Sequence, residues 1–197
     1  QCYNFFYDQL EKSNLFLQGI IDTAGCPMDD KMVDWLFANP LSDGGQFTGI
    51  ADNIMKYGVV PQSAMAETYS SENTTRLNRL LSLKLRQYGL ELRDMKQQGK
   101  SAADITARKE EMLKTVYRIL AQTLGEPPAQ FTWTLRDKEG NAVSTDTYTP
   151  QQFYRKFAGG DLKHDYVMLM NDPSREYYKL YEIDFDRHSY DGENWTY

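Results

Sequence analysis

The chain has 197 residues, of which 41% are hydrophobic and 25% charged, and such a composition can build a buried core without disulfides or structural metals. Lys and Arg number 22 against 28 Asp and Glu, and the net charge of −6 argues against a nucleic-acid-binding surface, which needs clustered cations. No apolar run reaches the length of about 18 residues that a membrane-spanning helix requires, so no membrane span is predicted.

Apolar residues at helical spacing dominate the first part of the chain. The segments in which this spacing predicts a helix are 3–18, 29–38, 46–57, 73–96 and 101–124. The residues that it predicts to face a core are Phe6, Leu10, Leu17, Met32, Val33, Leu36, Phe37, Leu77, Leu81, Leu85, Tyr88, Leu92, Met95, Ile105, Met112, Val116, Tyr117 and Leu120. Glu11 and Lys12 lie outside the apolar stripe of the first helix. Gly58 is expected to end the third helix in the left-handed conformation, and 59–73 reads as an extended polar connection.

After the last long helix the pattern changes to that of strands. Apolar and polar residues alternate over 131–135, and the turn residues of 137–141 predict a hairpin. A threonine followed by proline predicts a short helix over 149–157. Two further strands are predicted over 165–170 and 179–186. The chain is therefore expected to be α+β, with helices first and an antiparallel sheet later.

The chain offers few groups for nucleophilic or metal chemistry. Cys2 lies at the start of the chain, and Cys26 lies beside two aspartates whose charge opposes thiolate formation, so neither is expected to be a nucleophile. His164 and His188 stand in no recognisable catalytic context. The acidic pair within 184–186 lacks further ligands, so no metal and no cofactor are predicted. Two cysteines without a disulfide framework favour a reducing compartment.

Two adjacent glycines, Gly44 and Gly45, stand just before a predicted helix. They match no phosphate-binding pattern, since that requires a preceding strand and, in the P-loop, a lysine. One reading is a plain turn, which the residues alone favour. The other is the close approach of a peptide to bare backbone, with Phe47 and Met65 lining an apolar pocket for one substrate side chain.

Long stretches of the chain resemble one enzyme family. They include 3–14 (YNFFYDQLEKSN), 43–46 (DGGQ), 56–61 (KYGVVP), 70–86 (SSENTTRLNRLLSLKLR), 131–141 and 149–157 (TPQQFYRKF). On these residues the chain resembles the aminopeptidase C and bleomycin hydrolase family of papain-like cysteine peptidases. The resemblance implies part of a papain-like helical lobe over 1–68, a helical-hairpin insertion over 69–128, and a β-rich start of the second lobe over 129–197.

The resemblance also implies a role for the glycine pair. In papain-like enzymes such a pair binds the substrate backbone, so Gly44 and Gly45 become substrate-binding positions, with Gln46 and Phe47 beside the pocket for a neighbouring side chain. This shifts the expectation from a plain turn to close approach of a peptide. The family's Q-G-x-C-W-x-F, H-A-M-like and N-S-W-G-like contexts of nucleophile, base and orienting residue do not occur here. The chain is therefore expected to correspond to the stretch between nucleophile and base, and to be inert alone.

Two functions of different kinds follow from the resemblance. In the first, the chain is a portion of a cytoplasmic cysteine aminopeptidase that cleaves N-terminal residues from peptides through a thiolate and an acyl-enzyme. In the second, it is a non-catalytic helical interaction module that keeps only the family's assembly surface. The family forms a homohexameric ring, so a homo-oligomer is the partner that either function implies, besides the peptide substrate.

Overall fold

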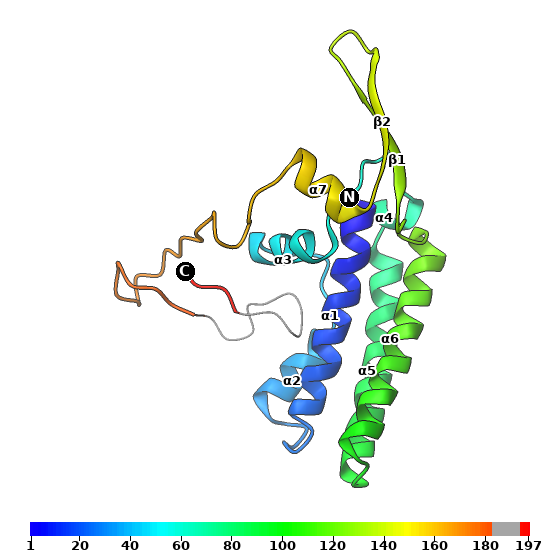
Figure 1. The fold of residues 1–197 in the computed structure, drawn as a ribbon. Helices are drawn as coiled ribbons and strands as arrows, with labels where there is room; N and C mark the ends of the chain where they lie inside the picture. Colours follow the sequence, from blue (N-terminus) through cyan, green and yellow to red (C-terminus); the bar gives the residue numbers. More distant parts are fainter. Residues whose placement is uncertain (183–193) are drawn as a thin grey trace.

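The computed structural model describes residues 1–182 and 194–197. Its helices are α1 (Cys2–Asp22), α2 (Lys31–Ala38), α3 (Phe47–Tyr57), α4 (Tyr69–Glu72), α5 (Thr75–Gln97), α6 (Ala102–Leu124) and α7 (Pro150–Phe157), and its strands are β1 (Phe131–Arg136) and β2 (Ala142–Tyr148). In Figure 1 three long helices, α1, α5 and α6, lie side by side, and the two strands extend beyond one end of them. The fold therefore combines helices with a small antiparallel sheet, as the sequence predicted at this level.

Local capping contacts fix where several helices begin. Asp30 starts α2 by accepting two backbone N–H bonds. Thr149 starts α7, as the sequence predicted, and it forms a reciprocal capping box with Gln152. Thr68 forms a second capping box at α4, a four-residue helix inside 59–73, where the sequence predicted only a connection. A single helical turn shows no apolar periodicity, so the pattern could not reveal it.

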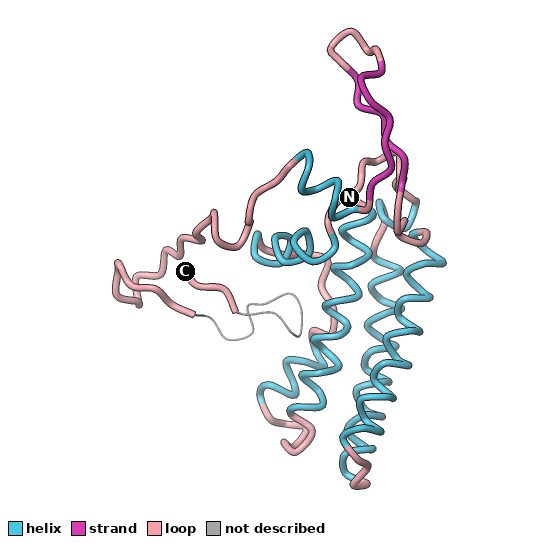
Figure 2. The backbone as a smooth tube through the Cα atoms, viewed as in Figure 1, coloured by secondary structure: helices cyan, strands magenta, loops and turns pink. Residues whose placement is uncertain are grey.

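The main core lies where α1 packs against α5 and α6 (Figures 1 and 2). Its buried residues are Cys2, Tyr3, Phe6, Phe16, Leu17, Ile20, Met65, Leu77, Leu81, Leu85, Tyr88, Leu92, Ile105, Met112, Val116, Leu120 and Leu124. Most residues that the helical spacing predicted to face inward are among them, and Leu10, Leu36, Phe37, Met95 and Tyr117 pack against them half-buried. Met32 is an exception, because its side chain is 41% exposed on α2.

Two charged side chains, Glu11 and Arg93, are buried outside the main apolar cluster, and both have partners. Glu11 lies off the apolar stripe of α1, as predicted, but it is buried where α1 meets α3. Its carboxylate accepts from the Tyr57 hydroxyl and from Lys56 Nζ at 2.8 Å, which makes its burial tolerable. Arg93 is likewise buried on α5 and donates to the carbonyl of Thr23, which follows α1, at 2.9 Å. Both side chains join helices that are distant in the sequence.

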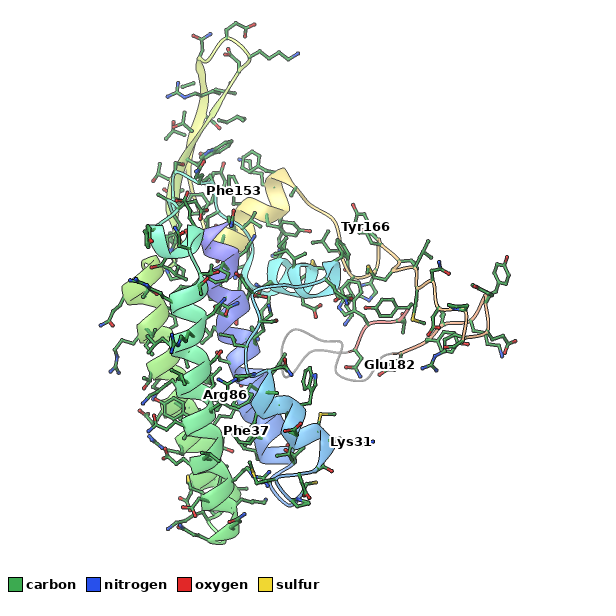
Figure 3. All side chains as sticks on the ribbon, turned by 180° about the vertical axis from the view of Figure 1, so that it is seen from behind. Lys31, Phe37, Arg86, Phe153, Tyr166 and Glu182 are labelled. Carbon is green, nitrogen blue, oxygen red and sulfur yellow. The ribbon has the colours of Figure 1, made fainter. Side chains whose placement is uncertain are left out.

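The strand hairpin is anchored at its base by aromatic rings. β1 pairs antiparallel with β2, starting with Phe131 opposite Tyr148, and Gly140 takes a φ of +88° in the predicted turn. Phe153 of α7, labelled in Figure 3, stacks edge-on against Phe131 and Trp133 with ring centroids 5.3 and 5.2 Å away. The far end of the hairpin projects away from the helices (Figure 2).

The segment after α7 departs from the sequence prediction. Residues 165–170 form no strand, although one was predicted there. A strand needs a neighbour for its backbone hydrogen bonds, and within the described residues this apolar run has none, so Leu169 is 90% exposed. Of the strand predicted over 179–186, only Glu182 pairs, in an isolated bridge with Thr196, and 183–186 lie outside the described residues. Among the described residues, no helix has both the length and the apolar character of a membrane span.

Candidate functional site

The glycine pair lies in the exposed connection between α2 and α3. A Cβ atom built on Gly44 or Gly45 would meet nothing within 4 Å, and neither residue has a positive φ. Gly58 shows the opposite case, because its φ is +77° and its Cβ would lie 2.3 Å from the carbonyl carbon of Pro150. That φ confirms the predicted positive value, although its ψ of −160° is outside the left-handed helical region. The described residues thus give Gly58 a reason to be glycine and give Gly44 and Gly45 none.

Side chains from two other helices hold this loop. Lys12 of α1 donates from Nζ to the carbonyl oxygens of Ser42 at 3.1 Å and Gly44 at 2.7 Å. Gln9, one turn earlier, donates to the Ser42 carbonyl at 3.1 Å. On the other side, the Thr74 hydroxyl before α5 donates to Asp43 Oδ2 at 2.5 Å. The loop is exposed but tethered, so its backbone has a defined direction.

Gln46 and Phe47 continue the loop into α3. Gln46 is the exposed residue before the helix, and Phe47 is its first residue. The ring of Phe47 contacts Tyr166, which Figure 3 labels, and Trp195, with centroids 5.8 and 6.0 Å away. Met65 instead lies in the main core, and none of the three main pockets among the described residues is lined by Phe47 or Met65, so the pocket predicted between them is not formed by these two residues. The aromatic neighbours of Phe47 come from segments more than 100 residues later, which no local pattern could show.

A second concave feature lies between α1 and α2. It is a half-open pocket of about 690 Å³ lined mainly by apolar side chains, among them Leu15, Phe16, Met32, Trp35 and Leu41. It ends at Ser42, next to the glycine loop. The apolar spacing did not indicate this pocket, because it predicted that Met32 faces the core. The signal in the sequence was Trp35, a large aromatic residue of the same helix that lies outside the predicted core-facing set; it is 58% exposed on α2.

The titratable groups do not form a catalytic arrangement in the part of the chain that the structure describes. Cys2 is fully buried, its Sγ lies 3.5 Å from the Leu124 carbonyl, and burial raises the pKa of its thiol. His164 Nδ1 lies 2.6 Å from Asp161 Oδ2, and the hydrogen bond with His164 lowers the pKa of that carboxyl. His188 and the acidic pair of 184–186 lie outside the described residues. Among the residues described, no group of three His, Cys, Asp or Glu could hold a metal ion.

Comparison with known proteins places these observations in a family context. The model of the peptidase C1-like family matches residues 1–197. Aminopeptidase C of Lactobacillus delbrueckii subsp. lactis is 41% identical over 187 residues, which are 94% of this chain and 41% of that protein. Human bleomycin hydrolase is 35% identical over 190 residues, which are 94% of this chain and 42% of that protein. The crystal structure of PepW from Lactobacillus rhamnosis HN001 aligns with a TM-score of 0.95 at 42% identity, over 100% of this chain and 44% of that one.

Proposed function

This chain belongs to the peptidase C1-like family, and from that premise we propose that it forms the peptide-facing portion of a cysteine aminopeptidase. The chain spans about two fifths of the length of the aminopeptidase C it matches. In this proposal Gly44 and Gly45 bind the substrate backbone, and Gln46 and Phe47 flank the pocket for a neighbouring side chain. The thiolate that attacks the peptide carbonyl, and the base that activates it, are supplied by residues other than these 197.

The absence of any internal reason for the glycine pair carries this proposal. Glycine loses more conformational freedom on folding than other residues, so two in succession call for a cause. Neither a positive φ nor a neighbouring atom supplies one at Gly44 or Gly45. The cause that we propose is the close approach of a substrate backbone, and an extended peptide that pairs with the loop makes such an approach.

The two cysteines support the proposal that these residues bind the peptide while the nucleophile is supplied by other residues. A cysteine nucleophile needs access to solvent and a lowered pKa. Cys2 has neither, because it is buried and its thiol pKa is raised. Cys26 is half-buried, and Arg93 Nη2 donates to its backbone carbonyl at 2.5 Å. We therefore propose neither thiol as the nucleophile of a papain-like mechanism.

A second candidate function is assembly, and the outer face of α5 favours it. Leu80, Leu83 and Leu90 are 49%, 57% and 55% exposed there, although they are large apolar side chains. We propose that 69–128 is a helical insertion which contributes to a homo-oligomeric ring, between the helical lobe of 1–68 and the start of the second lobe over 129–197. The free cysteines are in keeping with a cytoplasmic setting.

Substituting valine at Gly45 tests the peptide-binding proposal. Because the φ of Gly45 is not positive and its Cβ would meet nothing within 4 Å, Gly45→Val is expected to leave the free energy of unfolding nearly unchanged. It should nevertheless abolish binding of trialanine, measured by calorimetric titration, since the side chain stands where the peptide must lie. Gly25→Val is the matched control, because Gly25 is also exposed, free of close neighbours and without a positive φ. Equal trialanine affinity in the two variants would refute the proposal.

A further inference from the structure

Lys12 makes an unusually complete set of contacts for a side chain at the edge of the bundle. Its ammonium group has three donors. They have three acceptors within 3.1 Å: Asp8 Oδ2 at 2.8 Å, the Ser42 carbonyl at 3.1 Å and the Gly44 carbonyl at 2.7 Å. The side chains of Lys12 and Asp8 are only 17% and 20% exposed. All three donors are used, so the ammonium group is fixed relative to α1, and the loop is fixed to it.

The contact with Gly44 sets the direction of the next amide. The carbonyl of Gly44 and the N–H of Gly45 belong to one planar peptide group, which is trans. In a trans peptide the C=O and the N–H point in opposite directions. Since the Gly44 oxygen points at Lys12 on α1, the Gly45 N–H points away from α1. Among the described residues no hydrogen-bond partner meets the backbone N–H or C=O of Gly45.

We infer that Lys12, held by Asp8, is a positioning residue that aims the Gly45 N–H outward to donate to a peptide carbonyl. The inference rests on the proposed peptide-binding function and names the device that prepares the loop for it. Two adjacent glycines would otherwise sample many peptide-plane orientations, and ordering them at the moment of binding would weaken affinity. The ammonium group of Lys12 orders the Gly44–Gly45 peptide plane before the substrate binds. The N–H of Gly45 is then the backbone donor that this plane presents to substrate.

Three variants separate positioning from simple stabilisation. Lys12→Met keeps the length of the side chain and removes its three donors. Lys12→Arg restores donors that can reach the same carbonyls. Lys114→Met is the matched control, since it breaks a helix-surface ion pair, with Glu111 at 2.6 Å, that does not touch the loop. Each variant is labelled with ¹³C and ¹⁵N, and the carbonyl shift of Gly44 and the amide shift of Gly45 are recorded during titration with trialanine.

In Lys12→Met the Gly44 carbonyl resonance should move toward that of a carbonyl without a charged donor, and trialanine affinity should fall at least about fivefold. Lys12→Arg, which keeps charged donors, should retain most of the affinity that Lys12→Met loses. Lys114→Met should stay within about twofold of the unsubstituted chain, since exposed ion pairs contribute little. Unchanged Gly44 resonances in Lys12→Met, or unchanged trialanine affinity, would overturn the inference while leaving the peptide-binding function in place. If the unsubstituted chain shows no shift at Gly45 with trialanine, the proposed function fails, whatever the Gly44 carbonyl does in Lys12→Met.

Discussion

Truncation of Leu81 tests whether α1, α5 and α6 share one core. Leu81 is fully buried on the inner face of α5. Leu81→Ala removes three carbon atoms from the core, and at about 0.8 kcal/mol for each buried methylene equivalent the transfer loss is roughly 2.4 kcal/mol. The long packed helices cannot collapse fully into the space, so a cavity adds to this loss. We expect a total decrease of about 3 to 4 kcal/mol in the free energy of unfolding.

Urea denaturation followed by far-ultraviolet circular dichroism measures this decrease. Leu83→Ala is the matched control, because Leu83 lies on the same helix but is 57% exposed. It should change the free energy of unfolding by less than about 0.5 kcal/mol. A loss below about 1 kcal/mol for Leu81→Ala, or equal losses for both variants, would refute the packing argument.

Two more predictions concern a thiol and a carboxyl. Under native conditions iodoacetamide should modify half-buried Cys26 well before buried Cys2, whereas in urea both thiols should react at similar rates. Peptide mapping measures the two reactions, and modification of Cys2 first would contradict its burial. The hydrogen bond from the Asn141 side chain, and after it the one from the Asn141 backbone, lowers the pKa of the Asp137 carboxyl below its ordinary value. A lowered carboxyl pKa gives stability that is present above the unfolded value and is lost as the pH falls through the folded one. The protection of the Gly140 amide, measured as its exchange rate relative to that of an unstructured chain at the same pH, should therefore fall in acid, and Asp137→Asn should remove that dependence.

The helices were the predictable part of the fold. The pattern over 73–96 and 101–124 matches α5 and α6 to within two residues at each end, because a long amphipathic helix repeats its signal many times. The failed strand over 165–170 shows the limit of such reasoning. Its apolar residues satisfy strand propensity, but a strand exists only where a second strand accepts its hydrogen bonds, and composition does not reveal that partner.

The candidate site was only partly predictable. The doubled glycine marks Gly44 and Gly45 in the sequence, and the resemblance implies the role that we propose for them. The sequence could not show that nothing within the described residues requires glycine at these two positions, since that depends on φ and on neighbouring atoms. Lys12 stands 32 positions before Gly44, so its contact exists only through the packing of α1 against the loop. The spacing of Asp8 and Lys12, four residues apart on one helix, was the only local sign of the pair.

The central claim is that this chain binds a peptide backbone but carries no nucleophile. One measurement tests it most directly: hydrolysis of alanyl-p-nitroanilide by the 197-residue chain, with and without iodoacetamide, on a sample whose Gly45 amide shift reports trialanine binding. We predict that the Gly45 resonance shifts and that no p-nitroaniline is released above the rate in buffer. Release that iodoacetamide abolishes would contradict the account, because a cysteine of this chain would then be the nucleophile.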